Sequence, residues 1–125
     1  MLLHISEQSA ATLQEQILGQ IRSRILSNEL ATDFALPSIR GLAKDLKVSV
    51  ITVQRAYDAL LNEGLIYARR GKGFYVAALP ESDRSAVAVT RFEKNLQQLL
   101  EDARRDGLDE TQLQQIFVRS LRREN

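Results

Sequence analysis

The side chains most able to do chemistry in this sequence are cations concentrated in its middle third. Residues 38–80 carry seven basic and three acidic side chains, a net charge of +4, whereas residues 1–37 carry −2 and residues 81–125 carry −1. Such a local excess suits a polyanion, and the phosphates of a nucleic acid are the first candidate. An excess of this size also arises by chance. The secondary-structure elements that carry the cations must therefore indicate whether they serve nucleic-acid binding. The cations of interest are Arg40, Arg55, Arg69, Arg70 and Lys72.

Most other chemistries are excluded by residue type or spacing. The sequence has no Cys and a single His, His4, so a disulfide, a Cys-ligated zinc and a His cluster within one chain are ruled out. Gly71-Lys72-Gly73 lacks the spacing of a phosphate-binding P-loop, and no nucleophile–base set or carboxylate pair stands out. We therefore expect no enzyme, no metal and no cofactor.

The composition is that of a globular chain. The 125 residues are 44% hydrophobic and 26% charged, about one domain's worth. No apolar run approaches the ~20 residues of a membrane span, and residues 1–6 lack the features of a signal peptide. We expect a cytoplasmic protein with no membrane partner.

Three helices are predicted before residue 65. Leu13, Ile17, Ile21 and Ile25 share one face of a helix over residues 12–26. A loop over residues 31–37 leads to a short helix with Ser38 as its cap, and Lys47-Val48 forms a tight turn. Ser49 then caps a third helix from Val50 to about Glu63, which Gly64 ends.

A β-hairpin with a basic tip is predicted next. Residues 65–68 and 74–76 are β-prone and flank Arg69-Arg70-Gly71-Lys72-Gly73. Three helices with a tight turn, followed by such a hairpin, are the plan of a winged helix-turn-helix domain. In that plan the third helix enters the major groove of DNA, and the hairpin, or wing, lies along the backbone or minor groove.

The third helix has two chemically different faces. Its inward face is formed by Val53, Ala56, Tyr57 and Leu60. The other face carries two β-branched apolar residues that suit thymine methyl groups, beside polar groups that suit base edges or phosphates. The alternative is that Val50 and Ile51 pack beneath the loop 31–37. The outward residues are Val50, Ile51, Gln54, Arg55 and Asp58.

Two further helices are predicted in a tail that begins after Leu79-Pro80. The first, capped by Ser82 or Asp83, has apolar residues at steps of three and four, as in a coiled-coil seam, and Gly107 ends it. Asp109 and Gln112 begin the second, and the short loop between them implies an antiparallel pair. Two short helices need another surface to cover their apolar faces, and a second copy supplies it. The expected dimer interface is Val89, Phe92, Leu96, Leu99, Ala103, Leu113 and Phe117.

Several separated motifs resemble those of GntR-type transcriptional regulators. Residues 36–43, Leu-Pro-Ser-Ile-Arg-Gly-Leu-Ala, are similar to the family signature Leu-Pro-Ser-x-Arg-x-Leu-Ala. Residues 48–60 resemble its recognition helix, and residues 63–66 and 70–76 its helix end and wing. The resemblance covers residues 10–78. The short tail resembles that of the YtrA subfamily, which lacks the large effector-binding domain of most relatives.

The sequence departs from that family at informative positions. Lys47 stands where the family usually has Gly, which predicts strain or an altered turn. Val50-Ile51 replaces the Arg, Pro, Asn or Thr of many relatives, so no relative's base preference transfers. Phe74 takes the place of a common Thr in the wing.

The resemblance and the chemistry together imply a set of DNA contacts. Arg40 is the expected phosphate clamp, with a surface salt bridge to Asp45 or Glu63 as the alternative. Gln54 and Arg55 are the candidate base readers. The expected DNA-binding residues are Ser38, Arg40, Ser49, Val50, Ile51, Thr52, Gln54, Arg55, Arg69, Arg70, Gly71, Lys72 and Gly73.

We therefore expect a mainly α fold with a small β-hairpin wing, a winged helix-turn-helix domain over 10–79 and a two-helix dimerisation region over 83–123. The expected function is a homodimeric repressor on a palindromic operator, with helix 50–63 in the major groove and the wing 65–77 on the backbone or minor groove. An effector, if one exists, would be a small molecule bound between the tail helices and the winged domain. The alternative is an interaction module whose basic face binds protein. The operator, the regulated genes, the effector and the direction of regulation are not encoded in these patterns.

Overall fold

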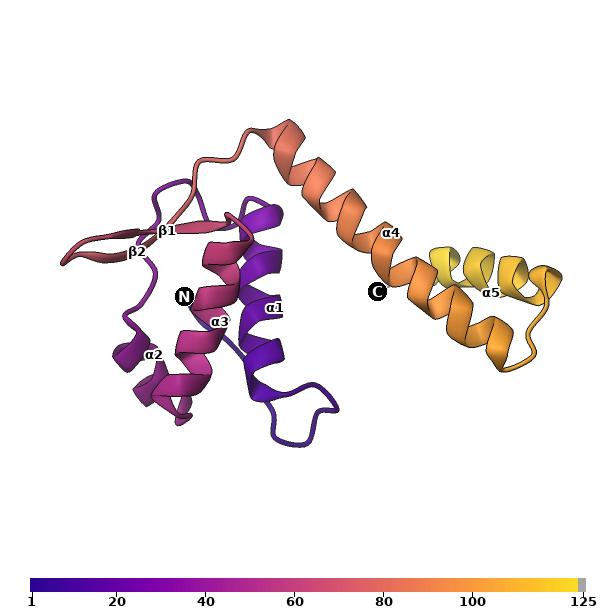
Figure 1. The fold of residues 1–125 in the computed structure, drawn as a ribbon, viewed down its shortest axis with the longest axis horizontal. Helices are drawn as coiled ribbons and strands as arrows, with labels where there is room; N and C mark the ends of the chain where they lie inside the picture. The colour runs from indigo at the N-terminus through magenta and orange to yellow at the C-terminus, as the bar shows by residue number, and fades with distance from the viewer. Residues whose placement is uncertain (124–125) are drawn as a thin grey trace. The chain divides into compact units, whose positions relative to one another are not determined.

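The computed structural model describes residues 1–123, apart from the side chains of residues 81 and 82, and divides into two compact units. We call residues 1–85 the head and residues 86–123 the tail. The elements, in chain order (Figure 1), are α1 (Leu13–Leu26), α2 (Ile39–Leu46), α3 (Val50–Asn62), β1 (Ile66–Arg69), β2 (Gly73–Val76), α4 (Glu81–Arg105) and α5 (Glu110–Arg122). The expected mainly α fold with a winged helix-turn-helix is confirmed. No helix within the described residues has the length and apolar composition of a transmembrane span.

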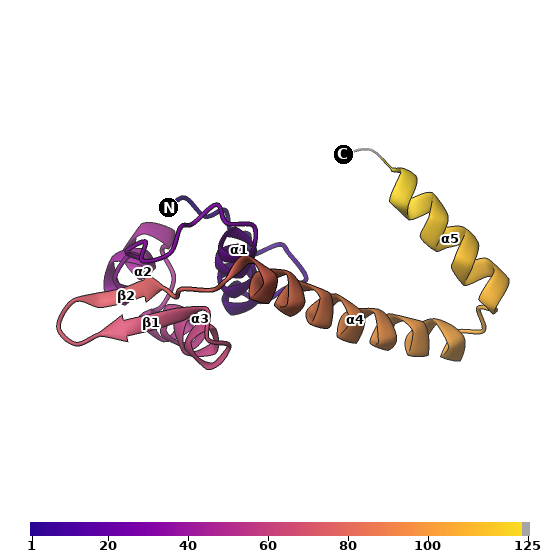
Figure 2. The ribbon, with the colours of Figure 1, turned by 90° about the horizontal axis from the view of Figure 1, so that it is seen from above.

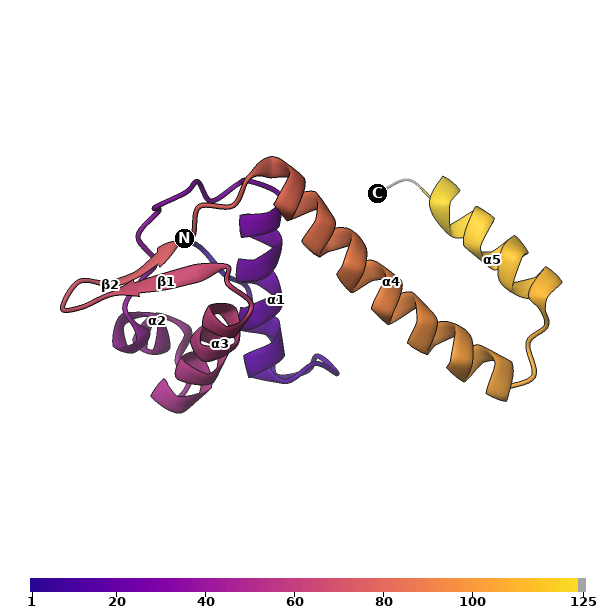
Figure 3. The ribbon, with the colours of Figure 1, turned by 45° about the horizontal axis from the view of Figure 1, so that its top comes forward.

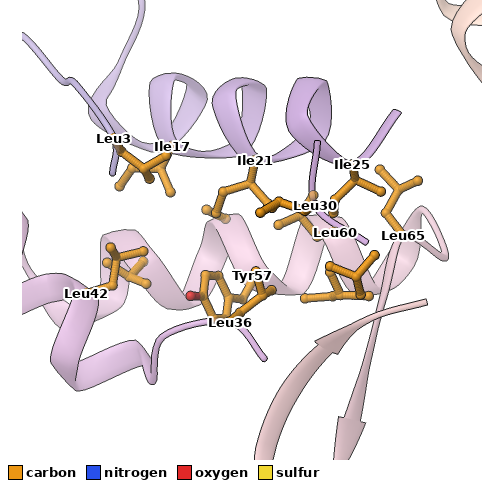
Figure 4. Close-up of a cluster of buried hydrophobic side chains, with 14 of the residues drawn as sticks. Leu3, Ile17, Ile21, Ile25, Leu30, Leu36, Leu42, Tyr57, Leu60 and Leu65 are labelled. Atoms are coloured by element: carbon orange, nitrogen blue, oxygen red, sulfur yellow. The ribbon is translucent and has the colours of Figure 1, made fainter. Parts of the chain in front are cut away.

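The core of the head is built where α1 packs along α3 (Figure 4). The predicted stripe on α1 supplies Ile17, Ile21 and Ile25, all fully buried. Complete burial of an aliphatic side chain contributes about 1.5–3 kcal/mol, so this stripe is the largest single stabilising feature of α1. The side chains that α3 contributes are Val53, Ala56, Tyr57 and Leu60.

The segment before α1 is also part of the core. Leu3 is buried, and two glutamines on α1 hold the backbone that follows it. Gln20 bonds to both the N–H and the carbonyl of His4, and Gln16 does the same at Ser6. Each amide thus pairs with the N–H and the carbonyl of one residue, as the backbone of a neighbouring strand would. The apolar pattern of the sequence did not predict these contacts.

The turn between α2 and α3 matches the prediction in its caps and in its strain. The Ser38 hydroxyl accepts a hydrogen bond from the Gly41 N–H, and the Ser49 hydroxyl accepts one from the Thr52 N–H, both at 3.0 Å. Lys47 ends α2 in the left-handed region, with φ 58° and ψ 46°. The Val48 N–H then donates to the Ala43 carbonyl, a bond typical of a left-handed helix ending.

The wing is a two-stranded antiparallel hairpin whose strands lie about one residue from their predicted positions. Ile66 pairs with Val76 and Ala68 pairs with Phe74. The segment 31–37, expected to be a plain loop, pairs with the outer edge of β2 through a bridge between Ala35 and Tyr75. That bridge is too short to leave a period-2 pattern in the sequence, which is why the prediction missed it.

The tail consists of α4 from residue 86 onward and α5, joined by a turn at Gly107, whose φ is 92°. The expected capping box of α5 is present, because Asp109 and Gln112 each bond to the other's backbone N–H at 2.9 Å. The expected cap of α4 at Ser82 or Asp83 is wrong, since the helix already begins at Glu81.

The two tail helices form an open V (Figures 2 and 3) rather than a closely packed antiparallel pair. None of the described side chains of residues 86–123 is buried. The apolar side chains that remain exposed are Val89, Phe92, Leu99, Ile116, Phe117, Val118 and Leu121.

Lys47→Gly is expected to raise the free energy of unfolding by about 0.5–1 kcal/mol, because glycine adopts the left-handed region without the penalty of a Cβ. Urea denaturation of the full chain at one fixed protein concentration measures the change. Lys47→Ala, which loses the same charge but keeps the strain, is the matched control. A Lys47→Gly variant no more stable than Lys47→Ala would show that the turn is unstrained.

Candidate nucleic-acid interface

The start of α3 presents apolar and polar groups to solvent side by side. Ile51 is 59% exposed and Val50 is 39% exposed, and Gln54 and Arg55 are also exposed. The alternative that Val50 and Ile51 are buried beneath the loop 31–37 is therefore wrong. Buried residues on the opposite face hold the helix in place, so this exposed face cannot rotate inward without opening the core.

Five basic side chains of the head are free to meet an external anion. Arg40, Arg55, Arg69, Arg70 and Lys72 are all exposed, and none forms a salt bridge within the described residues. Asp45 and Glu63 were the alternative partners for Arg40, and within the described residues neither forms a salt bridge with it. Glu63 instead binds Arg22 through two hydrogen bonds of 2.8 and 2.6 Å.

Two serines and a threonine at the helix starts have structural roles, and the predicted caps by Ser38 and Ser49 are confirmed. Ser38 caps α2 and Ser49 caps α3. The Ser49 and Thr52 hydroxyls also lie 2.8 Å apart and bond to each other. These caps orient the first turns of both helices, whose free N–H groups carry partial positive charge toward any bound phosphate.

The wing tip is shaped by glycines and tied to its strands. Gly71 and Gly73 have φ of 73° and 101°, which other residues rarely adopt. The Lys72 N–H donates to the Arg69 carbonyl at 2.9 Å, which closes the turn. The Tyr75 hydroxyl donates to the Lys72 carbonyl at 3.1 Å.

Tyr57 links α3 to both neighbouring parts of this surface. Its hydroxyl donates to the Pro37 carbonyl, 2.7 Å away, just before α2. Its ring meets Phe74 of β2 edge-on at 5.1 Å between centroids. Burial raises the pKa of Tyr57, so the phenol stays protonated and keeps this bond. The contact accounts for Phe74, where the family commonly has Thr, because a threonine side chain offers no ring to Tyr57.

The exposed face of the wing holds a second aromatic pair. Tyr67 and Tyr75 stack at 5.6 Å, and the Arg69 guanidinium lies 5.4 Å from the centre of the Tyr75 ring. The Tyr67 hydroxyl donates to Asp33 at 2.6 Å, and that hydrogen bond is the main reason the pKa of Tyr67 is raised. Strand alternation was the one sequence signal for this pair, because the residues that meet here come from three separate segments.

These features lie on a common side of the head. In all three views the wing projects on the side of α2, away from α1 (Figures 1–3). The start of α3 follows directly from α2 through the Lys47 turn. The predicted cations of α2, α3 and the wing are thus carried by three adjoining elements.

Sequence comparison finds regulators with the same domain. Residues 13–76 match the model of the bacterial regulatory proteins of the gntR family. The chain is 30% identical to the transcriptional repressor YtrA of Bacillus subtilis over 86% of its own length and 83% of the relative. It is 33% identical to the transcriptional repressor NagR of the same organism over 75% of its length, but spans only 38% of that protein.

Solved structures show the same fold. YtrA from Sulfolobus acidocaldarius, a GntR-family transcription factor, superposes with a TM-score of 0.59 and 31% identity, covering 75% of this chain and 99% of that one. The DNA-binding domain of AraR, solved in complex with operator ORE1, superposes with a TM-score of 0.51 and 25% identity over 62% of this chain and 94% of its own. The chain belongs to the GntR family of bacterial transcriptional regulators and carries that family's DNA-binding domain.

Proposed function

We propose that this regulator is a homodimeric repressor that binds a palindromic DNA operator through its two heads. The observation that carries the proposal is the two-faced α3, whose buried side fixes the helix while its start offers Val50, Ile51, Gln54 and Arg55 to solvent. An α-helix of this kind fits the major groove, where each base pair shows a distinct pattern of donors, acceptors and methyl groups. Repression would follow from steric occlusion of a promoter.

Within that docking, the roles divide by chemistry. Gln54 and Arg55 read base edges, and Val50 and Ile51 contact thymine methyls. Arg40 grips a phosphate with its planar guanidinium, while Ser38, Ser49 and Thr52 face phosphates at the helix starts. The wing lies on the backbone or in the minor groove, with Arg69, Arg70 and Lys72 supplying charge and Gly71 and Gly73 allowing close approach.

The tail supports a dimer because it has no core of its own. Four of the seven residues expected at the interface, Val89, Phe92, Leu99 and Phe117, are exposed in the single chain. Leu96 and Leu113 line a groove of about 420 Å³ between α4 and α5. A second tail would cover these side chains, and the two-fold symmetry would match a palindrome whose half-sites are about 34 Å apart.

The relatives support regulation by repression without fixing the target. YtrA and NagR are both named repressors, and the AraR domain was solved on its operator. A repressor of this family acts where the chromosome is, in the bacterial cytoplasm. The alternative, an interaction module whose basic face binds protein, explains less of α3, because it gives no role to the apolar Val50 and Ile51 exposed beside Gln54 and Arg55.

Arg40→Ala is expected to weaken binding to all duplexes by a similar factor, roughly five- to tenfold, and to lower the salt slope by about 1, since it loses a phosphate contact. Gln54→Ala is expected instead to change the ranking of sequences. Both variants are compared on a duplex library selected with the wild-type protein. Equal losses across the library for both would refute base reading by Gln54.

Replacing thymine with deoxyuridine at the contacted positions of a selected half-site is expected to weaken wild-type binding about three- to fourfold, the worth of one buried methyl group. The Val50→Ala/Ile51→Ala double variant should lose this discrimination, and deoxyuridine outside the half-site is the control. If the double variant still distinguishes the two bases, the methyl contact lies elsewhere.

Leu96→Asp is expected to convert the dimer to a 14.1 kDa monomer, because a charge would enter the apolar seam. Light scattering measures the mass. Thr90→Asp, which places the same charge away from the seam on α4, should leave the dimer intact. An unchanged mass for Leu96→Asp would show that the chains associate through another surface.

A further inference from the structure

We propose that Tyr75 is a positioning residue for DNA binding, because its ring holds the Arg69 guanidinium ready on the exposed face of the wing. The inference rests on the proposed function, in which the wing contacts DNA, and it adds a residue outside the expected set of contacts. It concerns how the wing presents charge, and it is carried by the contacts around one aromatic ring.

Three contacts converge on the Tyr75 ring and hydroxyl. The Arg69 guanidinium carbon lies 5.4 Å from the ring centre, within the range of a cation–π interaction. The Tyr67 ring stacks on the same side chain at 5.6 Å with 25° between the planes. The hydroxyl donates to the Lys72 carbonyl at 3.1 Å. Tyr75 therefore contacts two residues of β1, Arg69 and Tyr67, and also Lys72 in the turn.

The strand that carries the ring, β2, is held along its other edge by the segment 31–37. Ala35 bridges Tyr75 through the backbone, and the Val76 N–H donates to the Phe34 carbonyl at 3.0 Å. Asp33 accepts the Tyr67 hydroxyl at 2.6 Å, which fixes the second ring of the stack. The stacked Tyr67 and Tyr75 rings beneath Arg69 are thus supported by the segment 31–37, which is distant in sequence.

The contact with the Tyr75 ring leaves the N–H groups of the Arg69 guanidinium free to bind a phosphate. A planar guanidinium that lies on a ring uses its π face, whereas its N–H groups point outward in the plane, where a phosphate binds them. Within the described residues, no acceptor takes a hydrogen bond from the Arg69 side chain and no carboxylate pairs with it. Holding a long side chain in place before binding reduces the entropy lost when it meets DNA.

Arg70 provides an internal comparison. It is the next residue, carries the same charge and is also exposed, yet no aromatic ring within the described residues supports it. If the ring acts by positioning Arg69, its removal must weaken DNA binding only while Arg69 is present. If the ring only stabilises the hairpin, its removal must weaken DNA binding whether Arg69 or Arg70 remains.

The test measures the affinity of the full chain for one selected duplex with Tyr75→Val in three backgrounds: wild type, Arg69→Ala and Arg70→Ala. We expect Tyr75→Val to weaken binding about three- to fivefold in the wild-type and Arg70→Ala backgrounds, and less than twofold with Arg69→Ala. Tyr75→Phe keeps the ring and should stay within about twofold of wild type. Thermal denaturation of each variant confirms that it is folded.

The outcomes separate this inference from the proposed function. Equal losses from Tyr75→Val in all three backgrounds would overturn the positioning role while leaving the wing contact intact. An Arg69→Ala variant that binds DNA as tightly as wild type would contradict the wing contact itself, and the positioning role with it. A Tyr75→Val variant with wild-type affinity would overturn positioning alone, provided that Arg69→Ala is weakened.

Discussion

The packing of α1 against α3 is the interaction on which the other features of the head depend. Ile17, Ile21 and Ile25 are fully buried where α1 packs on α3, and the start of α3 remains exposed on its other side. A helix that must be half buried and half exposed has little freedom to rotate about its axis. The exposed residues at its start are therefore presented in a fixed orientation, which is what selective contact with base edges requires.

Tyr57 extends that constraint from the core to the rest of the surface. One side chain of α3 bonds to the backbone before α2 through its hydroxyl and packs against Phe74 of the wing through its ring. The three elements that carry the exposed cations are consequently joined through one buried residue. The wing is not a loosely attached hairpin, because the segment 31–37 also pairs with its outer strand.

The helices of the head and their caps could be predicted from sequence because their signals are local. Four-residue periodicity located α1, and the hydroxyls of Ser38 and Ser49 stand where each following helix begins. The two-faced character of α3, including exposed Val50 and Ile51, also followed from spacing alone. The capping box of Asp109 and Gln112 is local in the same way.

What the sequence could not reveal depends on segments that meet only after folding. The glutamine clamps on residues 4 and 6, the pairing of Ala35 with Tyr75 and the Arg22–Glu63 ion pair span 10 to 41 residues and follow no period. Local sequence patterns also could not predict the shape of the tail. The spacing of three and four identified apolar side chains on α4, but only the structure shows that α5 leaves Val89, Phe92 and Leu99 exposed.

The central claim is that the exposed start of α3 recognises a particular DNA sequence. The most direct test is the affinity of the full chain for a selected duplex and for a shuffled duplex of equal composition, each measured across a range of salt concentrations. We expect the selected duplex to bind at least about 10³-fold more tightly at physiological salt, and both affinities to fall steeply as salt rises. Equal affinity for the two duplexes, or binding that does not change with salt, would contradict it.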